Sequence, residues 1–88
     1  MIWIETQDTA TCIEISNVRI IKCNPPKDLK DEKPTYQIQT LIFNSSGEAT
    51  PYLLASYEDL SLASMIFEDL KNSIKTGAKF YSLVMSDG

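Results

Sequence analysis

The 88-residue sequence contains no histidine and a single arginine, Arg19. Histidine is the side chain that most often acts as a general base near neutral pH, and it is the commonest metal ligand. Its absence therefore argues against both acid–base catalysis and a metal site. Proteins that bind duplex nucleic acid gain most of their affinity from Lys and Arg, which neutralise phosphates. Here eight Lys and Arg face twelve Asp and Glu, for a formal net charge of −4, so we expect no nucleic-acid partner.

Glycine and long apolar runs are also scarce. The three glycines form neither a GxGxxG nor a Walker pattern, so the sequence offers no loop that could cradle a phosphate. No apolar run approaches the ~20 residues that a transmembrane helix requires. Met1–Asp8 has no basic region and no apolar run long enough for a signal peptide. These features predict a cytoplasmic protein with no membrane partner.

The two cysteines, Cys12 and Cys23, form no CxxC motif and have no histidine with which to share a metal ion. A structural zinc site needs about four ligands, so we expect no metal and no other cofactor. Both cysteines fall inside apolar runs, where a free cysteine packs as a small hydrophobe. We therefore expect buried free thiols, with a disulfide and a reactive thiol as the alternatives.

Two pairs of carboxylates, Glu58/Asp59 and Glu68/Asp69, come nearest to a catalytic arrangement. Each pair is adjacent in a stretch with helical periodicity, and neighbours on a helix point about 100° apart. Neither pair can converge on one substrate, whereas a solvated helix face explains both. We therefore expect no catalytic residue, no cofactor-binding residue and no enzymatic activity.

What the sequence does contain is typical of one soluble domain over residues 1–88, with 43% hydrophobic and 23% charged residues. Alternation of apolar and polar residues predicts strands at about 2–6, 11–15, 18–23, 36–43 and 49–57. The alternating apolar residues change from odd positions up to Ile15 to even positions from Val18, which predicts a tight turn or a bulge at Asn17. Asn44–Gly47 predicts a hairpin turn. Pro51 indicates that the following strand begins at an edge or a bulge.

Residues 59–76 predict the only helix. Its apolar stripe, broad enough to lie across a sheet, consists of Ala63, Ile66, Phe67, Leu70 and Ile74. Asp59 or Ser61 can cap the first turn. Gly77 lies where a left-handed residue ends a helix without a Cβ penalty. Residues 80–85 then predict a last strand or an extended arm.

Five strands, one helix and a last strand predict an α+β fold. We expect an antiparallel curved sheet of five or six strands packed on the one C-terminal helix. A half barrel like that of pleckstrin-homology domains and an open curved sheet are both compatible with this order.

The polar segment at about 24–34, in which Leu29 is the only leucine, isoleucine or valine, predicts a mobile surface loop. It is either a loop that binds a partner or an insertion that a surface hairpin tolerates.

The first eight residues, Met1–Asp8, resemble a recurrent start in small uncharacterised proteins of Gram-positive bacteria and their prophages. The later features that fit the same layout are Asn17–Val18, Tyr36, Gly47, Tyr52–Leu54, Tyr57, Gly77 and Tyr81. This family carries no assigned activity, so the resemblance implies only a fold and a bacterial or prophage setting. The 24–34 segment departs from the family pattern as a lengthened loop. No functional residue is transferred.

Leu41 and Phe43 are the candidate interaction residues. The face of their strand that we expect to fill the core carries Tyr36, Ile38 and Ile42. Leu41 and Phe43 lie on the opposite face, after two glutamines, and an exposed apolar patch there would mark a dimer or partner surface. In the alternative, the sheet curls and covers them.

The sequence thus predicts a small, non-enzymatic intracellular module that binds a protein partner or itself, including as a homodimer. An alternative is a prophage accessory protein that modulates a host factor through an acidic surface standing in for nucleic acid. A small enzyme or ligand carrier is the third hypothesis, and it would require a deep pocket with convergent polar groups.

Overall fold

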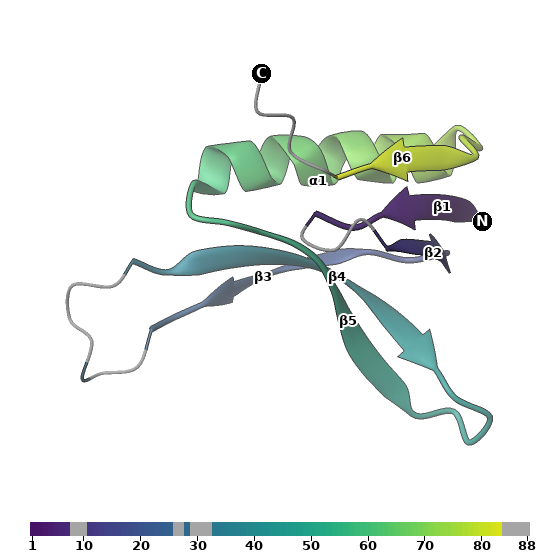
Figure 1. Ribbon diagram of the computed structural model, residues 1–88, viewed down its shortest axis with the longest axis horizontal. Helices are drawn as coiled ribbons and strands as arrows, with labels where there is room; N and C mark the ends of the chain where they lie inside the picture. The colour runs from purple at the N-terminus through teal and green to yellow at the C-terminus, as the bar shows by residue number, and fades with distance from the viewer. Residues whose placement is uncertain (8–10, 26–27, 29–32, 84–88) are drawn as a thin grey trace.

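The computed structural model describes residues 1–7, 11–25, 28 and 33–83. Within these residues the chain is α+β, with one helix near its C-terminus (Figure 1). The elements in chain order are β1 (Ile2–Glu5), β2 (Cys12–Ile15), β3 (Arg19–Cys23), β4 (Thr35–Phe43), β5 (Ala49–Tyr57), α1 (Leu60–Lys75) and β6 (Phe80–Ser82). Each lies where the sequence predicts it, and the fold class and element order are confirmed.

The strands form two three-stranded sheets, so the single curved sheet that we expected is not what the structure shows. The strand order is β2-β1-β6 in the first sheet and β3-β4-β5 in the second. The chain passes from one sheet to the other at residues 16–18, where the predicted turn separates β2 from β3. The arrangement of a pleckstrin-homology domain is not confirmed.

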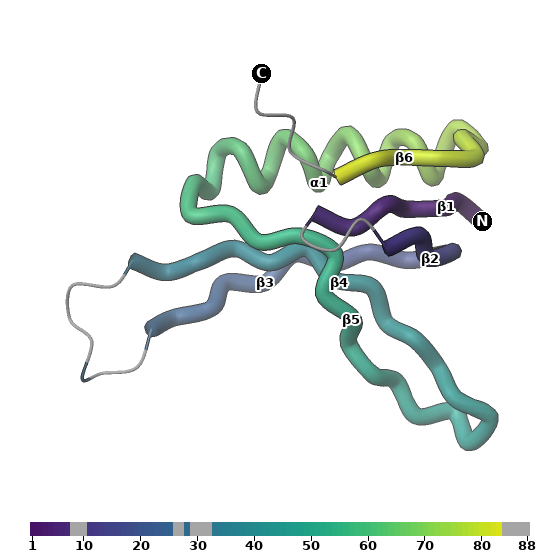
Figure 2. The backbone as a smooth tube through the Cα atoms, in the orientation of Figure 1, coloured from purple at the N-terminus to yellow at the C-terminus, as the bar shows by residue number. Residues whose placement is uncertain are grey.

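The pairing of β6 with β1 is parallel, whereas we expected an antiparallel sheet throughout. A parallel neighbour needs a long connection, usually helical, that returns the chain to the same end of the sheet. Here α1 and the turn after it carry the chain back along the molecule to the start of β1 (Figure 2). The direction of β6 therefore depends on where α1 packs, which local periodicity does not specify.

The junction between the two sheets is held by Asn17. The backbone N–H of Leu41 donates to Asn17 Oδ1 at 2.7 Å, and Asn17 Nδ2 donates to the Leu41 carbonyl at 3.0 Å. Thr40 Oγ1 donates to the Asn17 carbonyl at 2.8 Å. An amide side chain both donates and accepts hydrogen bonds. The Asn17 side chain therefore takes the place of the backbone N–H and carbonyl that a neighbouring strand would offer to Leu41. Accordingly, β3 pairs with β4 only as far as Gln39.

The end of β1 is attached to β5 by Gln7, whose N–H donates to the Leu54 carbonyl at 3.0 Å. Gln7 Oε1 accepts from the N–H of Ser56 at 2.8 Å. Leu54 is the extra residue of a β-bulge, because the register of β5 against β4 shifts at this point. A bulge changes the direction of side chains and bends the strand, and both Leu54 and Ala55 are 1% exposed. Pro51 lies on the edge strand of its sheet, as predicted, but the bulge lies three residues further on.

Both ends of α1 are capped by local hydrogen bonds. The side chain of Asp59 accepts from the N–H of Ser61 at 2.8 Å, which satisfies one of the free donors of the first turn. Gly77 has φ 81°, and the N–H of Ala78 donates to the Ser73 carbonyl at 2.9 Å. This is the Schellman arrangement that a left-handed residue after a helix permits. The predicted helix bounds and the role of Gly77 are confirmed.

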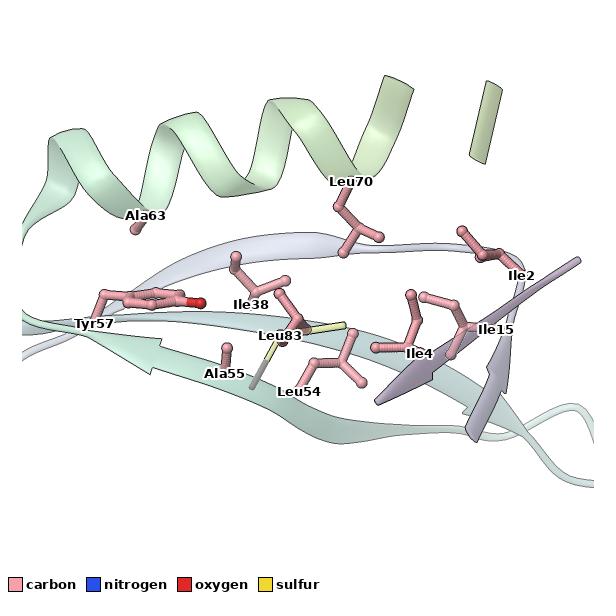
Figure 3. Packing of buried hydrophobic residues seen from close by; sticks show 10 residues of the cluster. All are labelled: Ile2, Ile4, Ile15, Ile38, Leu54, Ala55, Tyr57, Ala63, Leu70 and Leu83. Atoms are coloured by element: carbon pink, nitrogen blue, oxygen red, sulfur yellow. The ribbon is translucent and has the colours of Figure 1, made fainter. Parts of the chain in front are cut away.

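The core lies between α1 and the inner faces of the two sheets (Figure 3). Leu70 and Ala63 are the buried residues of α1, and in Figure 3 they point down towards Ile38 and Tyr57, respectively. The rest of the predicted stripe packs against this cluster and is partly buried. Among the residues that the structure describes, the buried hydrophobic ones are Ile2, Ile4, Ile15, Ile38, Leu54, Ala55, Tyr57, Ala63, Leu70 and Leu83.

Some expectations about burial are wrong. Cys12 is an exposed free thiol and Cys23 a half-buried one, because Cys12 lies opposite Glu5 in the ladder and thus faces outwards on an edge strand. Ile42, expected in the core, is 43% exposed.

The proposed loop at about 24–34 lies largely outside the described residues, as does the predicted end of the last strand. The helix of the described chain is not long and apolar enough to cross a membrane.

Candidate functional site

The distal half of the β4–β5 hairpin projects away from α1 and the core (Figure 1). Past Gln39, β4 has no further partner in β3, yet it continues to Phe43 paired with β5 alone. We define this projecting part, residues 41–53, as the arm. Every residue of the arm from Ile42 to Leu53 is exposed. The arm is therefore a two-stranded ribbon in contact with solvent on both faces.

The turn of the arm is closed by its own side chains. Asn44 Oδ1 accepts from the N–H groups of Ser46 at 2.9 Å and Glu48 at 3.0 Å. The N–H of Gly47 donates to the Asn44 carbonyl at 3.0 Å, and Gly47 has φ 85°, a conformation that glycine adopts without strain. These bonds keep β4 and β5 paired to the tip of the arm.

The arm carries large apolar side chains on both faces. In the register of β4 and β5, Thr40 lies opposite Tyr52 and Ile42 opposite Thr50, so Ile42 and Tyr52 share one face. Phe43 and Leu53 belong to the other face. The exposed fractions of these four residues are 43% for Ile42, 61% for Phe43, 36% for Tyr52 and 41% for Leu53. A two-stranded ribbon cannot bury such residues by itself, and exposed apolar surface of this kind marks interaction sites.

The arm is also nearly free of charge. Glu48, at its turn, is the only charged residue between Thr35 and Tyr57, whereas the whole chain is 23% charged. Soluble proteins commonly place lysine or another charge on exposed strands, because charge opposes pairing with other chains. The strands of the arm have no such charge. Its composition therefore resembles that of a surface that becomes covered.

The two sequence-predicted residues occupy different environments. Phe43 is exposed on the arm, which is the first of the two alternatives that the sequence left open, and the sheet does not curl over it. Leu41 is half-buried at the base of the arm, where its backbone is bound by Asn17. The exposed Ile42, Tyr52 and Leu53 escaped prediction, because alternation alone cannot show where covering elements end. The signal that could have found them is the uncharged stretch around Glu48.

No family model, no curated protein and no solved structure matches the chain. Two other features of the molecule are alternative candidates for a site: an open depression on α1 and the acidic side chains.

The first is an open depression on α1, lined in part by Met65, Asp69, Lys71 and Tyr81. Tyr81 Oη donates to Asp69 Oδ2 at 2.7 Å. Burial raises the pKa of the Tyr81 hydroxyl above its ordinary value, and the hydrogen bond and negative charge of Asp69 raise it further. Lys71 Nζ lies 3.2 Å from Glu68 Oε1. Tyr81 therefore keeps its proton near neutral pH. The Tyr81–Asp69 hydrogen bond and the Lys71–Glu68 ion pair are structural contacts.

The second is the distribution of acidic side chains. The described acids are spread over the molecule, at Glu5, Glu14, Asp28, Glu48, Glu58, Asp59, Glu68 and Asp69. Among the residues that the structure describes, no three His, Cys, Asp or Glu side chains are placed to hold a metal ion. A surface that imitates nucleic acid would need its carboxylates gathered on one face. The described acids are distributed over several elements, whereas the exposed apolar residues of the arm are contiguous, so the described residues favour the arm as the candidate site.

Proposed function

We propose that this protein is a small non-enzymatic interaction module that associates with a second copy of itself through the arm. The observation that carries the proposal is the continuous exposure of residues 42–53, with large apolar side chains on both faces of the ribbon. The proposal includes a cytoplasmic location and the bacterial or prophage setting that the amino-terminal resemblance implies.

The size of the exposed surface supports a partner. The whole chain has an accessible surface of 6169 Å², whereas area scaling gives about 5,200 Å² for a compact monomer of this mass. Its radius of gyration is 13.9 Å, against about 12 Å for a compact chain of this length. The arm contributes to this excess, because its residues from Ile42 to Leu53 are exposed.

The distribution of charge supports a second copy in particular. Each chain has a net charge of −4, so two copies repel each other over most of their surfaces. The arm, with Glu48 as its only charge, is where this repulsion is least. Apolar surface is complementary to itself, and in a two-fold dimer the same patch of each subunit meets its equivalent. The arm meets both requirements.

The proposal is tested by size-exclusion chromatography with light scattering over a wide range of protein concentration. We expect the wild-type chain to reach twice its 9.9 kDa mass and the double variant Phe43→Lys/Leu53→Lys to remain a monomer. The lysines place charge on one face of the arm, where charge opposes association. Circular dichroism checks that the variant keeps its secondary structure.

Met65→Lys is the matched control, because Met65 is 64% exposed but lies on α1, away from the arm. We expect this variant to associate as the wild type does. A wild-type chain that stays monomeric at high concentration would contradict the proposal. So would dissociation by Met65→Lys to the same extent as by the double variant.

A further inference from the structure

We infer that the outer face of the β2-β1-β6 sheet binds arginine side chains carried by another protein. Residues directly opposite each other in a ladder point to the same side, and alternate residues of a strand share that side. Ile2 and Ile4 of β1 are buried in the core, so Trp3 and Glu5 point outwards. Their ladder partners complete the outer face, which consists of Trp3, Glu5, Cys12, Glu14, Phe80 and Ser82.

Two aromatic side chains form the centre of this face. Trp3 of β1 and Phe80 of β6 are direct ladder partners, and they are 48% and 54% exposed. Neighbouring side chains in a sheet are close enough to form one continuous surface. The face of an indole ring is the strongest aromatic site for a cation. The sheet therefore presents an open aromatic surface that a flat cationic group fits.

Two carboxylates flank the aromatic pair. Glu14 is the ladder partner of Trp3 on the side opposite Phe80, and Glu5 follows Trp3 by two residues on the same face. Ser82 Oγ donates to Glu5 Oε1 at 2.8 Å, which orients this carboxylate. Among the six residues of the face, both charged side chains are acidic. The charge of the face is thus complementary to a cation placed over the aromatic pair.

Arginine fits this combination better than lysine. Its guanidinium group is planar, stacks on aromatic rings and can bind a carboxylate through two parallel hydrogen bonds. The single arginine of this chain, Arg19, already donates to Gln39 Oε1 from Nε at 3.1 Å and from Nη2 at 2.9 Å. The arginine that this face binds therefore comes from a different protein. The inference is independent of the proposed association through the arm.

The fluorescence of Trp3, the only tryptophan in the chain, reports binding directly. The protein is titrated at low salt with an acetylated and amidated GRGRG peptide, and with GKGKG and GQGQG peptides of the same length. We expect a saturable change with GRGRG, a weaker response to GKGKG and none with GQGQG. Added salt weakens the response, because exposed charges are screened.

The matched variants are Glu14→Gln, which removes a charge from the face, and Glu58→Gln, which removes an equal charge from an exposed position before α1. Glu14→Gln is expected to weaken binding of GRGRG by about two- to fivefold, as is usual for an exposed ion pair. Glu58→Gln is expected to leave it unchanged. Circular dichroism and thermal unfolding confirm that both variants fold.

Three results would overturn the inference: no saturable response to GRGRG, an equal response to GKGKG, or equal weakening by the two glutamine variants. The first removes the site, the second removes the preference for arginine, and the third reduces binding to net charge. The titration is repeated with Phe43→Lys/Leu53→Lys, where an unchanged response is expected because the arm lies outside this face. Failure of this inference and failure of the proposed association are therefore distinguishable.

Discussion

At the scale of single residues, Asn17 lies where the two sheets meet and bonds to β4. Its side chain supplies Leu41 with the donor and acceptor that a neighbouring strand would otherwise supply. Its carbonyl also accepts from Thr40, which is 1% exposed. A buried polar group that loses its partner keeps the full cost of desolvation. The Asn17 amide thus joins the base of the arm to the core on the β4 side, as Gln7 does on the β5 side.

Replacing Asn17→Ala is expected to lower the free energy of unfolding by about 1–3 kcal/mol, because Leu41 loses both side-chain partners. The measurement is chemical denaturation followed by circular dichroism. Asn72→Ala is the control, because Asn72 is exposed on α1, where alanine is the better helix former. Equal stability of the Asn17 variant and the wild type would show that the junction is held by other contacts.

At the scale of the element, α1 is defined by local signals and stabilised by distant ones. Its caps, formed by Asp59 and Gly77, are made within the helix and its flanking residues. Its burial comes from strands that are remote in sequence, and Leu70 and Ala63 are both 0% exposed. In proteins most of the stability of a helix comes from packing of its amphipathic face rather than from helix propensity. The stability of α1 therefore comes mainly from packing.

Leu70→Ala is expected to lower the free energy of unfolding by about 2–5 kcal/mol, through lost transfer energy and the cavity that remains. Chemical denaturation measures the change. Met65→Ala provides the comparison on the same helix, because Met65 is exposed, and it is expected to change stability little. If the two variants lost equal stability, the assignment of the buried face of α1 would be wrong.

At the scale of the whole molecule, the arm and the outer face of the β2-β1-β6 sheet are separate surfaces. The arm is apolar on both faces and carries one charge, Glu48. The outer sheet face combines an aromatic pair with two carboxylates. An apolar surface that is complementary to itself suits a second copy, and an acidic aromatic surface suits a cationic partner. The two proposed interaction surfaces therefore share no residue.

Association through the arm also predicts how stability depends on concentration. A partner that binds only the folded state stabilises it by mass action. The midpoint of thermal unfolding of the wild type should therefore rise with protein concentration. For Phe43→Lys/Leu53→Lys it should not. Scanning calorimetry over a hundredfold range of concentration measures both, and a constant wild-type midpoint would contradict coupling of folding to association.

Local sequence patterns are enough to specify the strands and the helix of this protein. The alternation in residues 36–43, the turn at Asn44–Gly47 and the stripe of α1 between Asp59 and Gly77 all specify local structure. They do so because strand and helix periodicities, caps and turn conformations depend on neighbouring residues. The alternation also placed Phe43 on the face of its strand opposite Ile38 and Ile42.

How these elements meet depends on contacts between distant segments of the chain. The division into two sheets at Asn17, the parallel pairing of β6 with β1 and the bulge at Leu54 all join segments that are distant in the sequence. The exposure of Ile42 follows from the same cause. Alternation states which side a residue faces, but whether that side is covered depends on which other strand or helix reaches it.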